Sequence, residues 1–208
     1  MGYADRYARA EFGGSVARLA QLPADDGREV AFAGRSNAGK SSALNAIMGR
    51  RGYARVSKTP GRTQLINLFE LGAGRRLVDL PGYGFARVPE RTRRNWEQLL
   101  AAYLEHRRSL VGVVMLVDAR RGLTDLDWRL IELLAPTGAA LHAVLTKADK
   151  LGRGEARRTL DDAYRALEDA GVEASLQLFS ATRPQGLDDL HGLLDEWYAW
   201  AEEDPDAS

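Results

Sequence analysis

The sequence predicts an α/β fold, with a doubly wound, mostly parallel sheet flanked by helices. Short apolar runs alternate along the chain with longer amphipathic stretches, and this alternation is typical of strands and helices in βαβ units. The most apolar run, residues 111–117, carries no charge, as expected of a central strand buried on both faces. The 208 residues are 45% apolar and 28% charged, which suits one globular domain.

The first part of the chain is expected to begin irregularly and then to supply three strands. Residues 1–27 have mixed polarity and several glycines, so only a short helix around residues 15–22 is expected there. Residues 30–33 are an apolar run that predicts a buried strand, and a Gly-rich turn then opens a helix at 41–48. Two more strands, at 64–71 and 76–80, flank a hairpin-like turn, Gly72-Ala73-Gly74.

The rest of the chain continues the alternation. Trp96, Leu100 and Tyr103 share one helical face, which predicts an amphipathic helix at 89–107. The remaining predicted elements are a strand at 111–117, a helix at 124–134, a strand at 141–145, a helix at 155–170, a strand at 175–179 and a helix at 187–201. His142 lies inside one of these apolar strands and is expected to be a core histidine.

Composition excludes several classes of protein. The chain has no cysteine, which rules out disulfides, thiolate metal sites and cysteine nucleophiles. Its longest apolar run, residues 110–117, is too short to span a bilayer. Charged residues near the N-terminus stand where a signal peptide would need an apolar core. The protein is therefore expected to be cytoplasmic, with no membrane partner.

The strongest motif is a phosphate-binding loop. Residues Gly34-Arg35-Ser36-Asn37-Ala38-Gly39-Lys40-Ser41 match G-x-x-x-x-G-K-S, between a predicted strand and a predicted helix. Backbone N–H groups of such a loop wrap the β-phosphate of a nucleotide, and the helix N-terminus adds positive potential. Lys40 is expected to bridge the β- and γ-phosphates, and the Ser41 hydroxyl is expected to bind Mg²⁺.

A second motif, Asp79-Leu80-Pro81-Gly82, lies at the end of another predicted strand. Asp79 can hold Mg²⁺ through a water molecule. The N–H of Gly82 can reach the γ-phosphate, because glycine lets the backbone approach closely. The tetrapeptide is common in turns, but its position after an apolar strand favours a role at the phosphates.

Two further segments are expected to bind the base. Thr146-Lys147-Ala148-Asp149 follows a predicted strand, and the Asp149 carboxylate can accept hydrogen bonds from two guanine N–H groups that adenine lacks. The stem of Lys147 can lie along the base plane. Phe179-Ser180-Ala181, continued by Thr182, follows the last predicted strand and can offer backbone N–H groups to guanine O6.

These four motifs, in this order, resemble those of translation-factor-related GTPases. Three longer stretches, Ser57–Asn67, Val78–Gly84 and Val117–Arg120, resemble the bacterial EngB family of the TrmE–Era–EngA–EngB superfamily. The resemblance runs from about residue 22 to the last helix. It implies a P-loop GTP-binding (G) domain at 23–202, an N-terminal extension at 1–22 and an acidic C-terminal tail at 203–208.

The resemblance also implies an activity and partners. The implied activity is slow, Mg²⁺-dependent hydrolysis of GTP to GDP and phosphate, in a switch that assists assembly of the large (50S) ribosomal subunit and is needed for normal cell division and septation. Gly61-Arg62-Thr63-Gln64-Leu65 is implied to fold over the nucleotide, with Thr63 as a second Mg²⁺ ligand beside Ser41. The implied partners are GTP or GDP and the rRNA and ribosomal proteins of a 50S precursor, bound by a monomer.

The catalytic group stays open among Lys40, Thr63 and Asn37. Many GTPases place a water-orienting glutamine after the glycine of the second motif, but here Tyr83 follows and has no amide. Slow intrinsic hydrolysis is therefore expected. Asn37 resembles the potassium-coordinating asparagine of related GTPases, which implies K⁺ as an activator. Arg62 is an alternative internal arginine finger.

One departure from the general GTPase pattern is Thr146, which stands where most GTPases have asparagine. The resemblance suggests that this threonine is normal for the family. The change is expected to remove a carboxamide that ties the base site together.

Charge is balanced overall but not locally. Residues 50–62 hold five basic side chains and no acidic one, which leaves open a polyanion partner or a solvated surface. Residues 188–206 are acidic with no Lys or Arg, and they are expected to form a solvated helix face and a frayed tail.

Two other classes of protein compete with a GTPase switch. A P-loop kinase would share the phosphate loop, but the Thr-Lys-Ala-Asp base motif and the lack of an obvious Arg-rich lid argue against it. A scaffold that uses GTP only for filament assembly would share every motif, but the sequence offers no filament surface.

Overall fold

The computed structural model describes residues 3–54, 65–84, 90–183 and 185–200. Its strands are β1 Glu11–Val16, β2 Arg28–Gly34, β3 Ile66–Gly72, β4 Arg75–Asp79, β5 Leu110–Asp118, β6 Ala140–Thr146 and β7 Ser175–Leu178. Its helices are α1 Tyr3–Ala8, α2 Lys40–Ile47, α3 Glu90–His106, α4 Asp125–Leu134, α5 Arg153–Asp169 and α6 Leu187–Trp197. Short 3₁₀ turns lie at Leu19–Gln21, Ala135–Thr137 and Ala148–Lys150.

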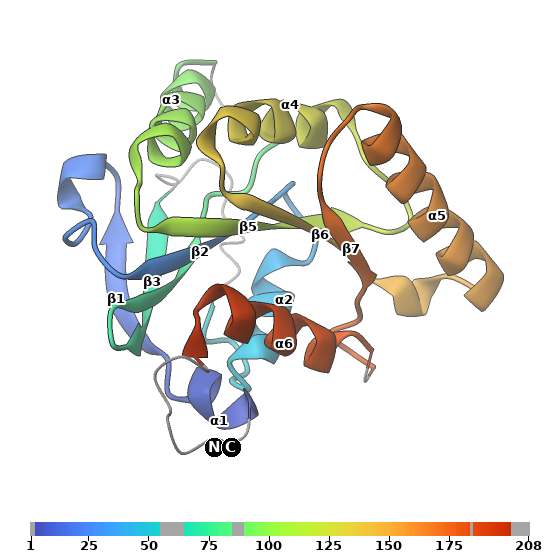
Figure 1. Cartoon of the computed structure of the whole chain (residues 1–208), viewed down its shortest axis with the longest axis horizontal. Helices are drawn as coiled ribbons and strands as arrows, with labels where there is room; N and C mark the ends of the chain where they lie inside the picture. Colours follow the sequence, from blue (N-terminus) through green and yellow to red (C-terminus); the bar gives the residue numbers. More distant parts are fainter. Residues whose placement is uncertain (1–2, 55–64, 85–89, 184, 201–208) are drawn as a thin grey trace.

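The described strands form one sheet in the order β1-β3-β4-β2-β5-β6-β7. The pairs β2–β4, β2–β5, β5–β6 and β6–β7 are parallel, whereas β1–β3 and β3–β4 are antiparallel. Helices cover both faces: α3, α4 and α5 lie on one side, and α1, α2 and α6 lie on the other (Figure 1). The predicted doubly wound α/β fold is confirmed.

The central strands are apolar on both faces because a core lies on each side of the sheet. In β2, Ala31 and Ala33 face the core under α3 and α4, while Val30 and Phe32 face the core under α2 and α6. A strand between two helical layers reads as a continuous apolar run. The apolar runs of β2, β5 and β6 in the sequence therefore predicted their positions.

The expectation of an irregular N-terminal segment is wrong. The region forms α1 and β1, and a short 3₁₀ helix at Leu19–Gln21 lies within the helical stretch expected around residues 15–22. β1 contains Gly13 and Gly14, which have low strand propensity, so its conformation depends on pairing with β3. That pairing joins residues at least 50 positions apart, from Val16 to Ile66 and from Glu11 to Glu70, and local sequence does not encode it.

The acidic C-terminal region is also more than a solvated face. Asp195 on α6 accepts hydrogen bonds from Arg6 Nη1 at 2.5 Å and from the Tyr7 hydroxyl at 2.7 Å, so α1 is attached to α6. Arg75 lies over the partly buried ring of Trp200, with 4.1 Å from its guanidinium carbon to the ring centroid. Residues 201–208, including the expected tail, lie outside the described part of the chain.

A buried carboxylate fixes the end of the sheet opposite the predicted loops. Glu29 at the start of β2 is fully buried. It accepts a bidentate pair of hydrogen bonds from Arg107 at 2.6 and 2.9 Å, and one from the Tyr103 hydroxyl at 2.9 Å. Arg76 of β4 approaches it at 3.4 Å. A buried charge is tolerated only when it is paired and hydrogen-bonded in this way.

We expect Glu29→Ala to lower the free energy of unfolding by about 3–5 kcal/mol, because it leaves two arginines with little solvent access and without their shared acceptor. Urea unfolding measures the loss. Arg157→Ala is the matched control, since it breaks an exposed ion pair within one helix and should change stability by less than about 0.5 kcal/mol. A loss below about 1 kcal/mol for Glu29→Ala would contradict this role.

Candidate nucleotide-binding site

The predicted motifs meet at one edge of the sheet. Four of them follow the carboxyl ends of β2, β4, β6 and β7, and these strands run parallel within the sheet. The carboxyl ends of parallel strands open at the same edge, where ligands bind in open α/β sheets. The fold therefore brings together loops that lie far apart in the sequence.

The phosphate loop connects the end of β2 to the start of α2. A side chain at Gly34 would place its Cβ 2.8 Å from the backbone oxygen of Leu116, so only glycine fits there. Gly39 caps α2 with φ +96°, a left-handed conformation that also favours glycine. The Ser36 N–H donates to the Tyr83 carbonyl at 2.7 Å, which joins this loop to the Asp79–Gly82 segment.

Lys40 and Asp79 contact each other in this structure. The Lys40 ammonium bonds to one oxygen of the buried Asp79 carboxylate. The other oxygen accepts a hydrogen bond from Asn67 Nδ2 at 3.1 Å. Asn67 lies opposite Asp79 in the β3–β4 register, and its Oδ1 accepts from the Ser15 hydroxyl at 2.6 Å. Sequence reasoning gave Asn67 no role, although an asparagine within an apolar strand was a visible signal.

Ser41 and Asp79 are the described groups that suit a Mg²⁺ ion. A hydroxyl and a carboxylate are hard oxygen ligands, and Mg²⁺ commonly takes one or two carboxylates together with phosphates and waters. The described residues contain no cluster of three or more His, Asp or Glu side chains that could hold a metal unaided. This sparse donor set fits an ion that is bound mainly through a nucleotide.

The Tyr83 side chain points into the core. Its ring is buried in the core, and its hydroxyl donates to Asp127 Oδ1 at 2.7 Å. Burial, followed by the nearby Asp127 carboxylate, raises the pKa of Tyr83 well above its usual value. Asp127 Oδ2 also accepts from the N–H and hydroxyl of Thr124, which caps α4. Tyr83 is thus a structural link between the Asp79–Gly82 segment and α4.

Thr146 has a hydroxyl where most GTPases have an asparagine carboxamide, and this hydroxyl makes contacts of its own with the phosphate loop and β5. Its buried Oγ1 lies 2.5 Å from the carbonyl oxygen of Ala38 in the phosphate loop and 3.1 Å from that of Val117 in β5. The carboxamide is absent, as the sequence indicated, and the hydroxyl provides a different tie between the base segment and the phosphate loop. A sequence pattern could not show it, because the partner is a backbone atom more than 100 residues away.

Lys147 connects the base segment to the phosphate loop a second time. Its ammonium donates to the Asn37 carbonyl at 2.6 Å and to Asp118 Oδ2 at 2.8 Å. Arg120 binds both oxygens of Asp118, at 2.6 and 2.8 Å. The Arg120 guanidinium lowers the pKa of Asp118 most, against the opposing effect of burial, and Lys147 lowers it further. Asp118 belonged to a family-like stretch, but its contact with Lys147 was not predicted.

A hydrogen bond from Ser180 orients the Asp149 carboxylate. The Ser180 hydroxyl donates to Asp149 Oδ1 at 2.7 Å, and this bond is the main cause of the lowered pKa of Asp149, ahead of opposing burial and nearby Lys150. The Ser180 N–H donates to Gln185 and the Thr182 N–H to Ser180 Oγ. Among the backbone N–H groups of Ser180, Ala181 and Thr182, that of Ala181 has no hydrogen-bond partner within the described residues. It is therefore the group available to a base oxygen.

Several predicted site residues cannot be placed. Gly61, Arg62, Thr63 and Gln64 lie outside the described part of the chain, while Leu65, just before β3, is partly buried. The remaining predicted residues, Arg35, Leu80, Pro81, Gly82, Ala148 and Phe179, lie in the loops or strand ends described above.

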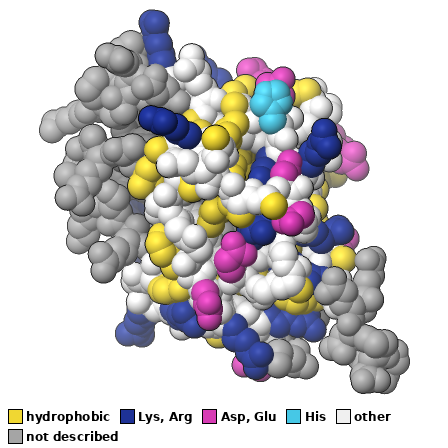
Figure 2. Space-filling view, turned by 90° about the vertical axis from the view of Figure 1, so that its left-hand side faces the viewer, with side chains coloured by type: hydrophobic (Ala, Val, Ile, Leu, Met, Phe, Trp, Pro, Cys, Tyr) yellow, Lys and Arg dark blue, Asp and Glu magenta, His cyan; other side chains and the backbone are white. Residues whose placement is uncertain are grey.

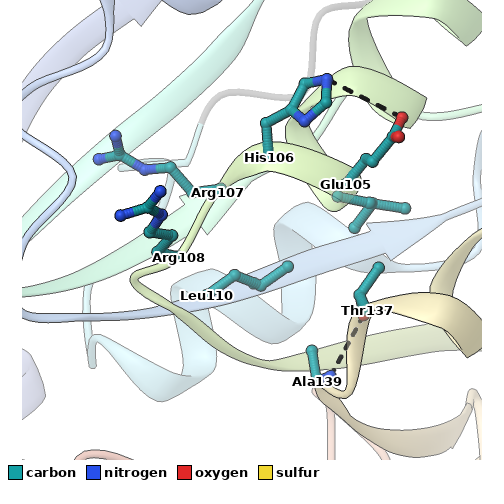
Figure 3. A pocket seen from close by; sticks show the side chains of 8 residues that line it. Glu105, His106, Arg107, Arg108, Leu110, Thr137 and Ala139 are labelled. Carbon is teal, nitrogen blue, oxygen red and sulfur yellow. Dashed lines mark hydrogen bonds and ion pairs between the residues drawn. The ribbon is translucent and has the colours of Figure 1, made fainter.

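Two hollows lie at opposite ends of the sheet. One, of about 140 Å³, borders the phosphate loop at residues 35–38 and is walled by Lys147, Asp118 and the segment leading into α4. The other, of about 160 Å³, lies between the end of α3 and residues 137–139. Figure 3 shows the guanidinium groups of Arg107 and Arg108 directed away from Thr137 and Ala139. The polar groups of that second hollow do not converge, so it is a poor ligand site.

Two of the three histidines, His142 and His191, take structural roles, whereas His106 is exposed at the end of α3. His142 is buried, and its ring nitrogens lie 2.7 Å from Ser175 Oγ and 3.0 Å from Gln177 Oε1; burial lowers its pKa. This confirms the predicted core histidine. His191 is also buried, stacked on Tyr7 with 4.9 Å between ring centroids.

Within the described residues, no helix has the length and apolarity needed to cross a bilayer.

Comparison with known proteins gives consistent matches over this fold and site. A family profile described as a 50S ribosome-binding GTPase matches residues 29–147. A GTP-binding protein EngB of Nitrosococcus oceani is 52% identical over 191 residues, which cover 92% of this chain and 96% of that protein. One of Azoarcus sp. is 50% identical over 193 residues, covering 92% of each chain.

Solved structures share the fold at lower identity. The crystal structure of a GTP-binding protein engB superposes with a TM-score of 0.63 at 22% identity, over 83% of this chain and 99% of that one. The protein Era, in complex with MgGDPNP and nucleotides 1506–1542 of 16S ribosomal RNA, superposes with a TM-score of 0.62 at 20% identity, over 82% of this chain and 56% of that one. Both agree with the P-loop GTPase architecture.

We expect Thr146→Val to weaken GTP and GDP binding about 5- to 10-fold, and to a similar extent, because an isosteric side chain leaves the buried Ala38 carbonyl without its donor. Titration with both nucleotides measures the effect. Thr146→Ser keeps the hydroxyl and should bind like the unaltered protein. Unchanged affinity of Thr146→Val would show that the hydroxyl does not organise the loop.

Proposed function

This chain belongs to the EngB family of GTP-binding proteins, and on that basis we propose that it is a Mg²⁺-dependent GTPase switch that assists assembly of the large ribosomal subunit in the cytoplasm. Normal cell division and septation would depend on that assembly. The observation that carries the proposal is the direct bonding of the base segment to the phosphate loop, from Thr146 to Ala38 and from Lys147 to Asn37. This bonding makes one rigid cradle for a guanine nucleotide.

The proposed nucleotide contacts follow from this cradle. Backbone N–H groups of residues 34–41 would receive the phosphates, and Asp149 with the Ala181 N–H would read the guanine. Lys40 now neutralises Asp79, so nucleotide binding would move its ammonium from the carboxylate to the β- and γ-phosphates. Asp79 would then be free to serve the magnesium site together with Ser41. Residues 61–65, with Thr63 as the second Mg²⁺ ligand, would cover the nucleotide.

Slow hydrolysis is consistent with the position of Tyr83. A buried tyrosine that donates to Asp127 does not orient a water molecule at the γ-phosphate. When bound, Mg²⁺ would stabilise the charge that develops on the phosphate oxygens. We further propose that Asn37, whose side chain is exposed on the loop, helps to hold K⁺, since a carboxamide oxygen suits that ion. Arg62 as an internal finger is the alternative source of positive charge.

The proposed partner is a precursor of the large subunit, contacted by a monomer through rRNA and ribosomal proteins. One observation from the comparisons supports it: the matching family profile is described as a 50S ribosome-binding GTPase. The basic stretch at residues 50–62 adds charge suited to a polyanion.

GTP hydrolysis should require Mg²⁺ and should be faster in K⁺ than in Na⁺. Removing Mg²⁺ with EDTA should abolish it. Replacing Na⁺ by K⁺ at constant ionic strength should raise it, because Asn37 would add a monovalent cation near the phosphates. Phosphate release measures both effects, and Asn37→Ala should remove the difference between the two salts while GDP affinity is retained. Equal rates in KCl and NaCl for the unaltered protein would refute the potassium proposal.

Binding to 50S precursor particles should be tighter with a non-hydrolysable GTP analogue than with GDP, since GTP would order residues 61–65 beside the basic stretch. Co-sedimentation across a salt series measures it. Arg51→Ala should reduce the log–log salt slope by about one if Arg51 contacts a phosphate, whereas Arg157→Ala, exposed on α5, should not. Equal recovery in both nucleotide states, without salt dependence, would count against the proposal.

A further inference from the structure

An aromatic platform lies at the β1 edge of the sheet, away from the nucleotide cradle. We use this name for Phe12, Phe69 and Tyr53 together with Arg50. Phe12 meets Phe69 edge-on at 5.8 Å between ring centroids, and Tyr53 meets Phe69 at 5.6 Å. Arg50 lies over the Tyr53 ring at 4.8 Å and donates to the Ala10 carbonyl at 3.0 Å. The loop after α2 is thus fixed to the start of β1.

The outermost ring of this platform is open to solvent. Phe12 is 55% exposed, whereas Phe69 behind it is buried and Tyr53 is partly buried. A single exposed apolar side chain is ordinary on a protein surface. Phe12 differs because its ring is braced by a second buried ring, which holds its orientation before any ligand arrives.

Arginines lie on the segments next to Phe12. Arg9 and Arg51 are exposed on the segments that flank the platform, and Arg50 is partly exposed. Successive side chains of a strand point to opposite faces, so the neighbouring acid Glu11 lies on the other side of the sheet, opposite Glu70 in the register. Several Lys and Arg side chains gather along the lower edge of this side of the molecule (Figure 2).

The geometry of β1 disfavours a protein strand as the ligand. A register shift between Phe12 and Gly14 interrupts the regular ladder, and Gly14 has φ +127°. Bulges of this kind keep an edge strand from pairing with another chain. An aromatic face with arginines beside it instead has the chemistry of sites that stack unpaired RNA bases and hold the adjoining phosphates.

We propose that the aromatic platform binds single-stranded RNA, with one unpaired base stacked on Phe12 and the adjoining phosphates held by Arg9 and Arg51. This inference rests on the proposed function, because it assigns a contact point for the RNA of the ribosomal precursor. It concerns residues that take no part in the nucleotide cradle, so GTP hydrolysis and RNA stacking can be tested separately.

The test measures RNA binding by fluorescence anisotropy, using the full chain with a GTP analogue and two labelled probes of equal length: a 12-nucleotide oligoadenylate and an abasic ribose-phosphate chain. Phe12→Ala should weaken oligoadenylate binding about 5- to 150-fold, the effect of losing one stacked base, and leave the abasic probe almost unaffected. Tyr164→Ala is the matched control, since Tyr164 on α5 is 54% exposed and should change neither affinity.

Two further variants separate stacking from folding. Phe12→Leu keeps an apolar contact with Phe69 but has no aromatic face, so it should lose affinity as Phe12→Ala does. Phe12→Trp should bind as well as the unaltered protein or better. Wild-type affinity for oligoadenylate in both Phe12→Ala and Phe12→Leu, or equal binding of the two probes by the unaltered protein, would overturn the inference.

Co-sedimentation with 50S precursor particles distinguishes this inference from the proposed function. If the unaltered protein binds particles but Phe12→Ala leaves RNA affinity unchanged, the platform is refuted and the proposed function stands. If Phe12→Ala loses particle binding without losing RNA affinity, the platform contacts a protein and the RNA inference is also wrong. If the unaltered protein stacks RNA but does not bind particles, the proposed function fails and the platform stands.

Discussion

The burial of β2 on both faces is the constraint on which the rest of the structure depends. This strand hydrogen-bonds to β4 and β5 on its two edges and has a helical core on each side. Polar chemistry is therefore confined to its ends. At the amino end, Glu29 is neutralised by Arg107 and accepts a hydrogen bond from Tyr103. At the carboxyl end, Gly34 lets the chain turn against β5 and enter α2. The first end contributes stability, and the second presents the site.

The candidate site is organised by contacts between loops more than by any single motif. Thr146 and Lys147 both reach carbonyl oxygens of the phosphate loop, so the base and phosphate segments would move as one unit. Asp118 restrains Lys147, and Ser180 restrains Asp149, so each side chain proposed to bind the base has a supporting partner. Orienting such groups before the ligand arrives reduces the entropy lost on binding. The Thr146 hydroxyl thus connects the base segment to the phosphate loop, as an asparagine carboxamide does in most GTPases.

The candidate nucleotide site and the aromatic platform proposed to bind RNA lie at different places in this fold. Tyr83 links the segment after β4 to the cap of α4 through Asp127, and this link holds its side chain in the core. This arrangement suits a GTPase switch whose intrinsic hydrolysis is slow and is accelerated by an external factor. The aromatic platform around Phe12 lies on the β1 edge, and its four side chains do not belong to the motifs proposed to bind the nucleotide. Separate surfaces allow the nucleotide state and RNA contact to be altered independently by mutation.

The sequence by itself determined the α/β class, the order of β2 to β7 and the location of the phosphate and base motifs. These features depend on local patterns, namely apolar periodicity and fixed spacing such as that from Gly34 to Ser41, and they are readable without a partner. Only the tertiary structure decided the rest. β1 exists because β3 pairs with it, Asp195 is partly buried because α1 packs on α6, and Asn67 meets Asp79 across a strand pair. Each of these depends on segments far apart in the chain, whose approach no local propensity specifies.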